Sequence, residues 1–135
     1  MISRNVSPAL LALLSLVAPA AEPPADWIDA DTGHRVVRLS QEPESASLYF
    51  HQNPFTAEGD KMIFAAPGGL STIDLKTREI KLIVPGFKYS VRGSGGLEVG
   101  HKSRQVYYEK DGAVWVTHLD TAATRQLAKL PPDTS

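Results

Sequence analysis

The chain has 135 residues, of which 42% are hydrophobic and 21% are charged, and this composition excludes a largely disordered protein. Its formal net charge of −1 gives no electrostatic basis for binding nucleic acid or an anionic membrane. It has no cysteine, which excludes disulfide bonds and thiolate metal sites.

The N-terminal segment has the features of a secretory signal peptide. Arg4 supplies a positive charge, residues 9–17 are apolar, and Ala18-Pro19-Ala20 has the pattern of a cleavage site. The apolar run is too short to span a bilayer. We therefore expect a signal peptide over residues 1–20, a mature chain that starts near Ala21, and export to the bacterial periplasm or beyond. After cleavage we expect no membrane association. The alternative is a hydrophobic N-terminal helix or a retained anchor.

The remaining chain predicts strands and turns, with no helical period. In chain order, the expected strands cover residues 36–40, 61–66, 70–75, 78–84, 105–109, 114–119 and 124–130. Pro67-Gly68-Gly69 and Lys110-Asp111-Gly112 are typical of tight turns between them. This pattern predicts an all-β fold for residues 21–135.

A repeat underlies these strands. It consists of a polar residue and a threonine followed by a basic and aliphatic run, in DTGHRVVRL, KTREIKLIV and DTAATRQLAKL. The threonines are Thr32, Thr77 and Thr121, which are 45 and 44 residues apart. A period of about 44 residues is the length of a four-stranded β-propeller blade. A β-sandwich would explain the spacing of the strands but not the repeat.

The length permits about two blades plus one closing strand. A closed propeller needs about four to eight blades. We therefore expect residues 21–135 to be the incomplete N-terminal part of a propeller.

Candidate ligand-binding residues lie in the segments expected to connect blades. Residues 47–55 are expected to cross from the outer strand of one blade to the inner strand of the next, at the mouth of the central channel. There His51 and Gln52 are candidates for binding a sugar or its carboxylate, and capping of backbone groups is the alternative. Lys88 and Arg92 lie in the equivalent segment one blade later, where they are either ligands for a carboxylate or exposed loop cations.

Four stretches carry a resemblance to a known family: WIDADTGHRVVRLS, YFHQNPFTAEGDKMIF, IDLKTREI and GSGGLEVGHKSRQVYYEKDGAVWVTHLDT. In this order they resemble the start of an oligogalacturonate lyase, from Trp27 to Pro132. Residues 55–64 also look like a turn of TolB-like propellers.

The resemblance implies a seven-bladed propeller that cleaves oligogalacturonides, or other uronate oligosaccharides, by β-elimination. In this reaction a base removes the proton alpha to the uronate carboxyl group, while a divalent metal, typically manganese, and basic residues neutralise the carboxylate. The resemblance places the base and the metal ligands in later blades. No catalytic or metal-binding residue is therefore assigned within this chain, which we expect to be inactive by itself.

Two other functions stay open. A non-enzymatic TolB-like binding propeller of the periplasm would need no histidine cluster in later blades. The propeller cap of a serine peptidase would be followed by an α/β domain with a Gly-x-Ser-x-Gly elbow. Within the chain, His118 is expected to be a hydrogen-bonded histidine of a blade, and Trp115, on the opposite face, is expected to pack between blades.

Overall fold

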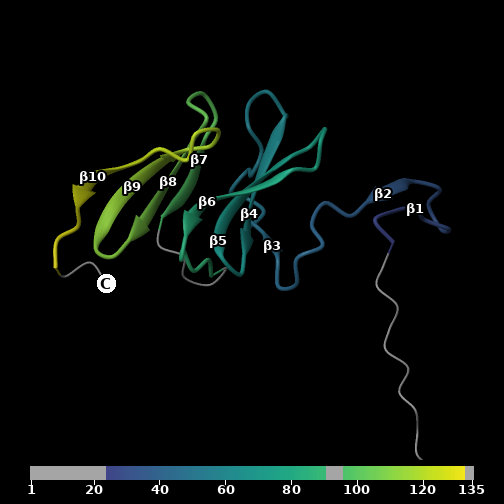
Figure 1. The fold of residues 1–135 in the computed structure, drawn as a ribbon, viewed down its shortest axis with the longest axis horizontal. Coiled ribbons are helices and arrows are strands. Elements are labelled where there is room, and N and C mark those ends of the chain that lie inside the picture. The colour runs from purple at the N-terminus through teal and green to yellow at the C-terminus, as the bar shows by residue number, and fades with distance from the viewer. Residues whose placement is uncertain (1–23, 91–95, 133–135) are drawn as a thin grey trace, which may run out of the picture.

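The computed structural model of the chain describes residues 24–90 and 96–132. In these ranges it is all-β, as predicted, with three antiparallel sheets side by side (Figure 1). The strands are β1 (Asp26–Ile28), β2 (Arg35–Val37), β3 (Ala46–Ser47), β4 (Lys61–Ala66), β5 (Gly69–Asp74), β6 (Ile80–Pro85), β7 (Leu97–Gly100), β8 (Gln105–Lys110), β9 (Ala113–His118) and β10 (Thr124–Lys129). The described ranges contain no helix that could cross a membrane. The expected signal peptide lies outside them.

Two of the sheets are complete propeller blades. Strands β3 to β6 form the first blade and β7 to β10 the second, and in each blade every strand pairs with its neighbour in sequence. This four-stranded antiparallel meander is the repeating unit of a β-propeller. The six strands expected between residues 61 and 130 agree with β4, β5, β6, β8, β9 and β10 to within two residues at each end. The strand expected at 36–40 is the shorter β2, which pairs with β1 in a separate hairpin.

The sequence repeat corresponds to a turn that occurs three times. In each turn the residue after the threonine has a positive φ, which is 69° at Gly33, 64° at Arg78 and 60° at Ala122. Each of these residues donates its backbone N–H to the carbonyl oxygen four positions earlier, at 2.8–2.9 Å. The turns join β1 to β2, β5 to β6, and β9 to β10. The β1–β2 hairpin therefore corresponds to the outer two strands of a preceding blade.

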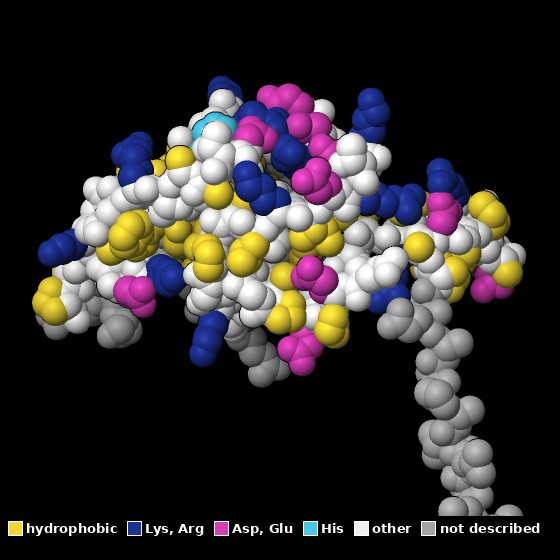
Figure 2. Space-filling model, in the orientation of Figure 1, with side chains coloured by type: hydrophobic (Ala, Val, Ile, Leu, Met, Phe, Trp, Pro, Cys, Tyr) yellow, Lys and Arg dark blue, Asp and Glu magenta, His cyan; other side chains and the backbone are white. Residues whose placement is uncertain are grey.

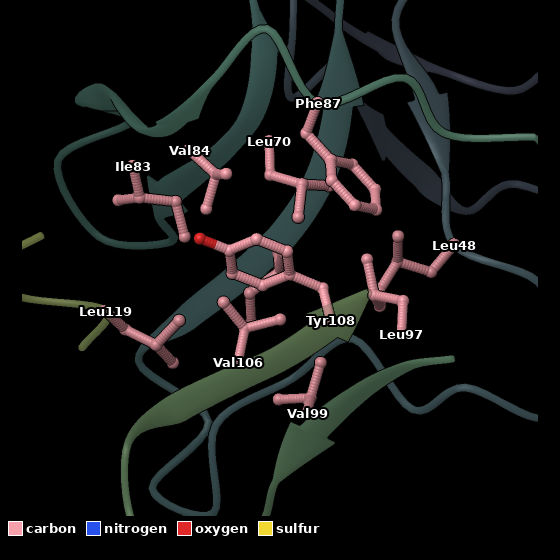
Figure 3. Close-up of a cluster of buried hydrophobic side chains, with 11 residues drawn as sticks. Leu48, Leu70, Ile83, Val84, Phe87, Leu97, Val99, Val106, Tyr108 and Leu119 are labelled. Carbon is pink, nitrogen blue, oxygen red and sulfur yellow. The ribbon is translucent and has the colours of Figure 1, made fainter. Parts of the chain in front are cut away.

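The hydrophobic core lies between the two complete blades (Figure 3). The first blade contributes Leu70 and Ile83, and the second contributes Val106 and Tyr108, all of them at most 2% exposed. The Tyr108 hydroxyl group forms a hydrogen bond with the Thr117 hydroxyl group at 3.0 Å, so its polar atom is satisfied within the core. Trp115 packs against this cluster, as predicted. Because the blades share one core, their stability depends on their stacking.

The innermost strand of the first blade is interrupted. Ser47 pairs with Phe64, and the next pairing joins Phe55 to Met62. Phe55 lies eight positions after Ser47, whereas Met62 lies only two positions before Phe64, which leaves six extra residues. Residues 48–53 therefore loop out of the strand, and we call them the inner-strand bulge. In the second blade β7 pairs with β8 without a break.

One expectation about the blade connections was wrong. Residues 47–55 do not cross between blades, because they leave and rejoin the same innermost strand. The connection into the first blade is instead made by residues 38–45. In addition, β3 and β7 were not among the expected strands. The two-residue β3 and the four-residue β7 are too short to give a clear period-2 pattern in the sequence.

Candidate binding site at the innermost strands

The inner-strand bulge is packed against the second blade. A turn closes it, in which the backbone N–H of Gln52 donates to the carbonyl oxygen of Tyr49 at 2.8 Å. At its start Leu48 is 4% exposed and belongs to the core between the blades, where it lies beside Leu97 (Figure 3). The bulge is thus anchored at both ends by the fold.

The side chain of Gln52 connects the bulge to the second blade. Its Nε2 donates to the carbonyl oxygen of Leu97 at 2.9 Å. Its Oε1 accepts hydrogen bonds from the Tyr89 hydroxyl group at 2.8 Å and from the Tyr49 backbone N–H at 3.3 Å. The same Tyr49 N–H also donates to the Tyr89 hydroxyl oxygen, at 2.6 Å. Gln52 therefore holds the bulge in one position relative to the second blade.

The Leu97 carbonyl group that Gln52 contacts lies on the open edge of β7. The carbonyl oxygen of Gly96 accepts a hydrogen bond from the Glu109 N–H at 3.2 Å, and successive carbonyl groups of a strand point to opposite edges. Gln52 thus caps a backbone group that no described strand pairs. This is the capping contact that the sequence left open as an alternative. Substrate binding by Gln52 stays a prediction. Its side-chain amide has two N–H hydrogens, and the bond to Leu97 uses one of them.

Three rings meet at the outer end of the bulge, and we call Tyr49, Phe50 and His51 the aromatic tip. The Tyr49 and Phe50 ring centroids are 4.5 Å apart, and the His51 ring lies 4.7 Å from the first and 5.4 Å from the second. Phe50 is 84% exposed and Tyr49 is 39% exposed. The tip therefore presents apolar ring surface to solvent beside the imidazole of His51.

The predicted basic residues lie in the segment that leads into the second blade. Lys88 is exposed and adjacent to Tyr89, whose hydroxyl group contacts the bulge. Arg92 lies outside the described residues. The structure thus brings Gln52 close to the segment that carries Lys88, and His51 is exposed on the same bulge. The roles of His51, Lys88 and Arg92 in substrate binding stay predictions.

A second polar group, which sequence reasoning missed, joins the blades at their upper edge. Arg104 donates to both carboxylate oxygens of Asp60 at 2.9 Å, to those of Asp120 at 2.8 and 2.9 Å, and to Glu58 at 2.7 Å. We call these four residues the Arg104 cluster. Figure 2 shows acidic and basic side chains interspersed along this edge. Hydrogen bonds from Arg104, with one from Thr56 to Asp60, hold the pKa of Asp60 well below its ordinary value. Arg104 likewise lowers the pKa of Asp120.

One signal in the sequence could have revealed the Arg104 cluster. Asp60 and Arg104 are 44 residues apart, so they occupy the same position in successive repeats. Equivalent positions of adjacent blades lie next to each other when the blades stack. Opposite charges at one repeat position therefore predict an ion pair between blades.

A cavity of about 230 Å³ lies between the blades beside this cluster. Its two lysines already have partners: the Lys61 ammonium lies 3.7 Å from Asp74 and 3.8 Å from Asp120, and Lys81 donates to the backbone carbonyl oxygen of Asp120. The charged groups that line the cavity therefore contact one another, so the cavity is a polar contact region between the two blades.

The described residues do not form a metal site. No group of three or more His, Asp or Glu side chains within residues 24–90 and 96–132 is placed to hold a metal ion. The carboxylates of the Arg104 cluster are already paired with Arg104, and Asp120 also with Lys61. A manganese ion therefore does not fit the residues of this part of the chain.

The fold is similar to two solved structures of oligogalacturonate lyases. The enzyme from Vibrio parahaemolyticus matches with a TM-score of 0.64 and 21% identity over 79% of this chain and 29% of that chain. An oligogalacturonate lyase in complex with manganese matches with a TM-score of 0.62 and 26% identity over 78% of this chain and 29% of that chain. A scan of protein-family models and a search of curated proteins give no match. The chain thus spans about three tenths of the length of the two enzymes, and within that span it shares their fold.

Proposed function

We propose that this chain is the N-terminal part of a protein that cleaves oligogalacturonides, or closely related uronate oligosaccharides, by β-elimination. The observation that carries the proposal is the structural likeness to two oligogalacturonate lyases over nearly four fifths of the chain. The sequence resemblance over residues 27–132 covers the same blades. The proposal includes export, which the leader expected over residues 1–20 favours.

The proposed reaction breaks the glycosidic C–O bond beta to a uronate carboxyl group. A base takes the alpha proton, its electron pair forms the new carbon–carbon double bond, and the leaving oxygen receives a proton. Negative charge accumulates on the carboxylate during this step, so cations nearby lower the barrier. The product carries an unsaturated uronate at its new non-reducing end.

The proposal divides the work between this chain and residues outside it. This chain would supply scaffold and one rim of the binding site, with His51, Gln52, Lys88 and Arg92 as its polar groups. The base would lie outside the chain. So would the ligands of a divalent metal, for which manganese in one of the structural neighbours is the precedent.

The test is turnover of trigalacturonate by the full-length protein, with and without added Mn²⁺, followed by the ultraviolet absorbance of the unsaturated product. We expect turnover by the full-length protein and none by the 135-residue chain alone. Binding of trigalacturonate without turnover would instead favour a non-enzymatic binding propeller. If the full-length protein neither binds nor cleaves trigalacturonate, the proposal is refuted. Turnover by the 135-residue chain alone would refute the division of work.

A further inference from the structure

The inner-strand bulge is present in only one of the two blades that the structure describes. At the equivalent register of the second blade, β7 pairs with β8 from Leu97 to Gly100 without interruption. Looping out six residues breaks the strand ladder and leaves backbone groups that need other partners. Irregularities of this kind are over-represented next to active sites, where they direct side chains. The bulge therefore calls for an explanation beyond the fold of the blade.

The aromatic tip exposes surface that proteins usually bury. Phe50 is 84% exposed, although phenylalanine is one of the most frequently buried residue types. It packs on Tyr49 and His51 within the tip. Single exposed apolar side chains are ordinary, but apolar groups that gather in one exposed patch, as Tyr49 and Phe50 do, are a feature of binding surfaces.

The tip is also held in a defined position. Leu48 anchors the bulge in the core, and Gln52 fixes it through hydrogen bonds to Tyr89 and Leu97. A surface that is ordered before binding avoids the entropy loss of ordering on binding. Exposure together with rigid support distinguishes the tip from a loose loop.

We propose that the aromatic tip is a sugar-stacking surface at the channel rim, which takes one uronate ring of the oligosaccharide. This proposal rests on the proposed function and deepens it. The face of a phenyl ring is electron-rich and apolar, and it suits the polarised C–H groups on one face of a pyranose. Phe50 supplies that face. His51 beside it has a ring nitrogen donor and acceptor for a hydroxyl or carboxylate group at the edge of the sugar.

Gln52 and Tyr89 act as positioning residues in this arrangement. The Gln52 Oε1, the Tyr89 hydroxyl group and the Tyr49 backbone N–H form hydrogen bonds with one another. Gln52 also donates to the Leu97 carbonyl oxygen, which fixes the bulge to the second blade. Removing the Tyr89 hydroxyl group would loosen the bulge without removing a ring of the tip. Substrate affinity should then fall less than after loss of Phe50 itself.

The experiment measures kcat and KM for trigalacturonate in the full-length protein with three variants of these residues and one control. Phe50→Ala is expected to raise KM about tenfold with kcat within about twofold, because it removes binding that does not change in the transition state. Phe50→Trp should restore KM to within about threefold of the wild-type value, and Tyr89→Phe should raise KM about threefold with kcat unchanged. The control is Leu82→Ala on β6, the outermost strand of the first blade, where an apolar side chain that is 44% exposed lies three strands away from the inner-strand bulge.

The outcomes separate this inference from the proposed function. A wild-type protein that cleaves trigalacturonate, with Phe50→Ala within about twofold of it in KM, would overturn the stacking surface alone. If the wild type does not cleave, calorimetric titration with trigalacturonate decides: weaker binding by Phe50→Ala supports the tip, and equal or no binding overturns it. A joint loss of melting temperature and kcat in Phe50→Ala would show that Phe50 packs against another part of the protein, which also overturns it.

Discussion

Replacing Arg104 by methionine is expected to lower the free energy of unfolding of the full-length protein by about 2 kcal/mol at neutral pH. A hydrogen bond to a charged group contributes about 1.5–3 kcal/mol when it is shielded from water, and an exposed ion pair contributes about 0.2–1 kcal/mol. The Arg104 side chain is 26% exposed and its three acidic partners are 36–57% exposed. Solvent therefore weakens each contact, but Arg104 makes five of these hydrogen bonds, so the expected total of about 2 kcal/mol exceeds that of one exposed ion pair. Methionine keeps the apolar stem of the side chain, so the change removes mainly the charge.

The loss should depend on pH with a definite sign. Arg104 is the main cause of the lowered pKa of Asp60 and of Asp120, whose ordinary value is 3.8. A carboxyl group with a lowered pKa in the folded state stabilises the protein above its unfolded pKa, and this stabilisation is lost as the pH falls through the folded pKa. The difference between wild type and Arg104→Met should therefore be largest at neutral pH and shrink below about pH 3.8.

Urea denaturation at neutral pH and at about pH 3 measures this difference. Lys102→Met is the matched control, because Lys102 is exposed two positions away and its replacement changes the net charge equally. We expect the control to stay within about 0.5 kcal/mol of the wild type. Equal losses in the two variants, or a deficit for Arg104→Met that grows on acidification, would refute the reasoning.

Two further predictions concern the repeat. Ala122 has a φ of 60° at the turn position where the first repeat has Gly33, so Ala122→Gly should raise the free energy of unfolding by about 0.5–1 kcal/mol; a lower melting temperature would contradict this. Ile83 and Leu127 occupy equivalent positions but are 2% and 41% exposed, because the second blade covers Ile83 and no described blade covers Leu127. In urea denaturation of the 135-residue chain, Ile83→Ala should therefore cost about 2–4 kcal/mol and Leu127→Ala less than about 1 kcal/mol. Equal costs would show that the two blades are not packed as described.

The sequence alone determined the class of the fold and the length of its unit. Thr32, Thr77 and Thr121 predicted a repeat of about 44 residues, and the structure shows one turn geometry at all three places. The strands from β4 to β6 and from β8 to β10 were predicted to within two residues. These features depend on neighbours only a few positions apart, such as the hydrogen bond across four residues in each turn, and local chemistry is readable in the sequence.

Part of the candidate site was also visible. The polar and aromatic stretch around His51 and Gln52 was predicted to cross between blades at the channel mouth, and the structure places it instead within the innermost strand of the first blade. The predicted path of this stretch was wrong, because no residue within 48–53 indicates that the strand resumes at Phe55. The pairing partners of this strand lie in β4, and only the register of the pairs reveals the loop of six residues.

Only the tertiary structure decided which side chains meet. Gln52 contacts the Leu97 carbonyl group from 45 residues away, and Arg104 contacts Asp60 and Glu58 from 44 and 46 residues away. Each distance is close to one repeat, because stacking of blades brings equivalent positions together. The sequence contained the charges and the amide, but their partners follow from how one blade packs on the next. That packing is set by a shared core in which Leu70, Ile83 and Tyr108 become buried together.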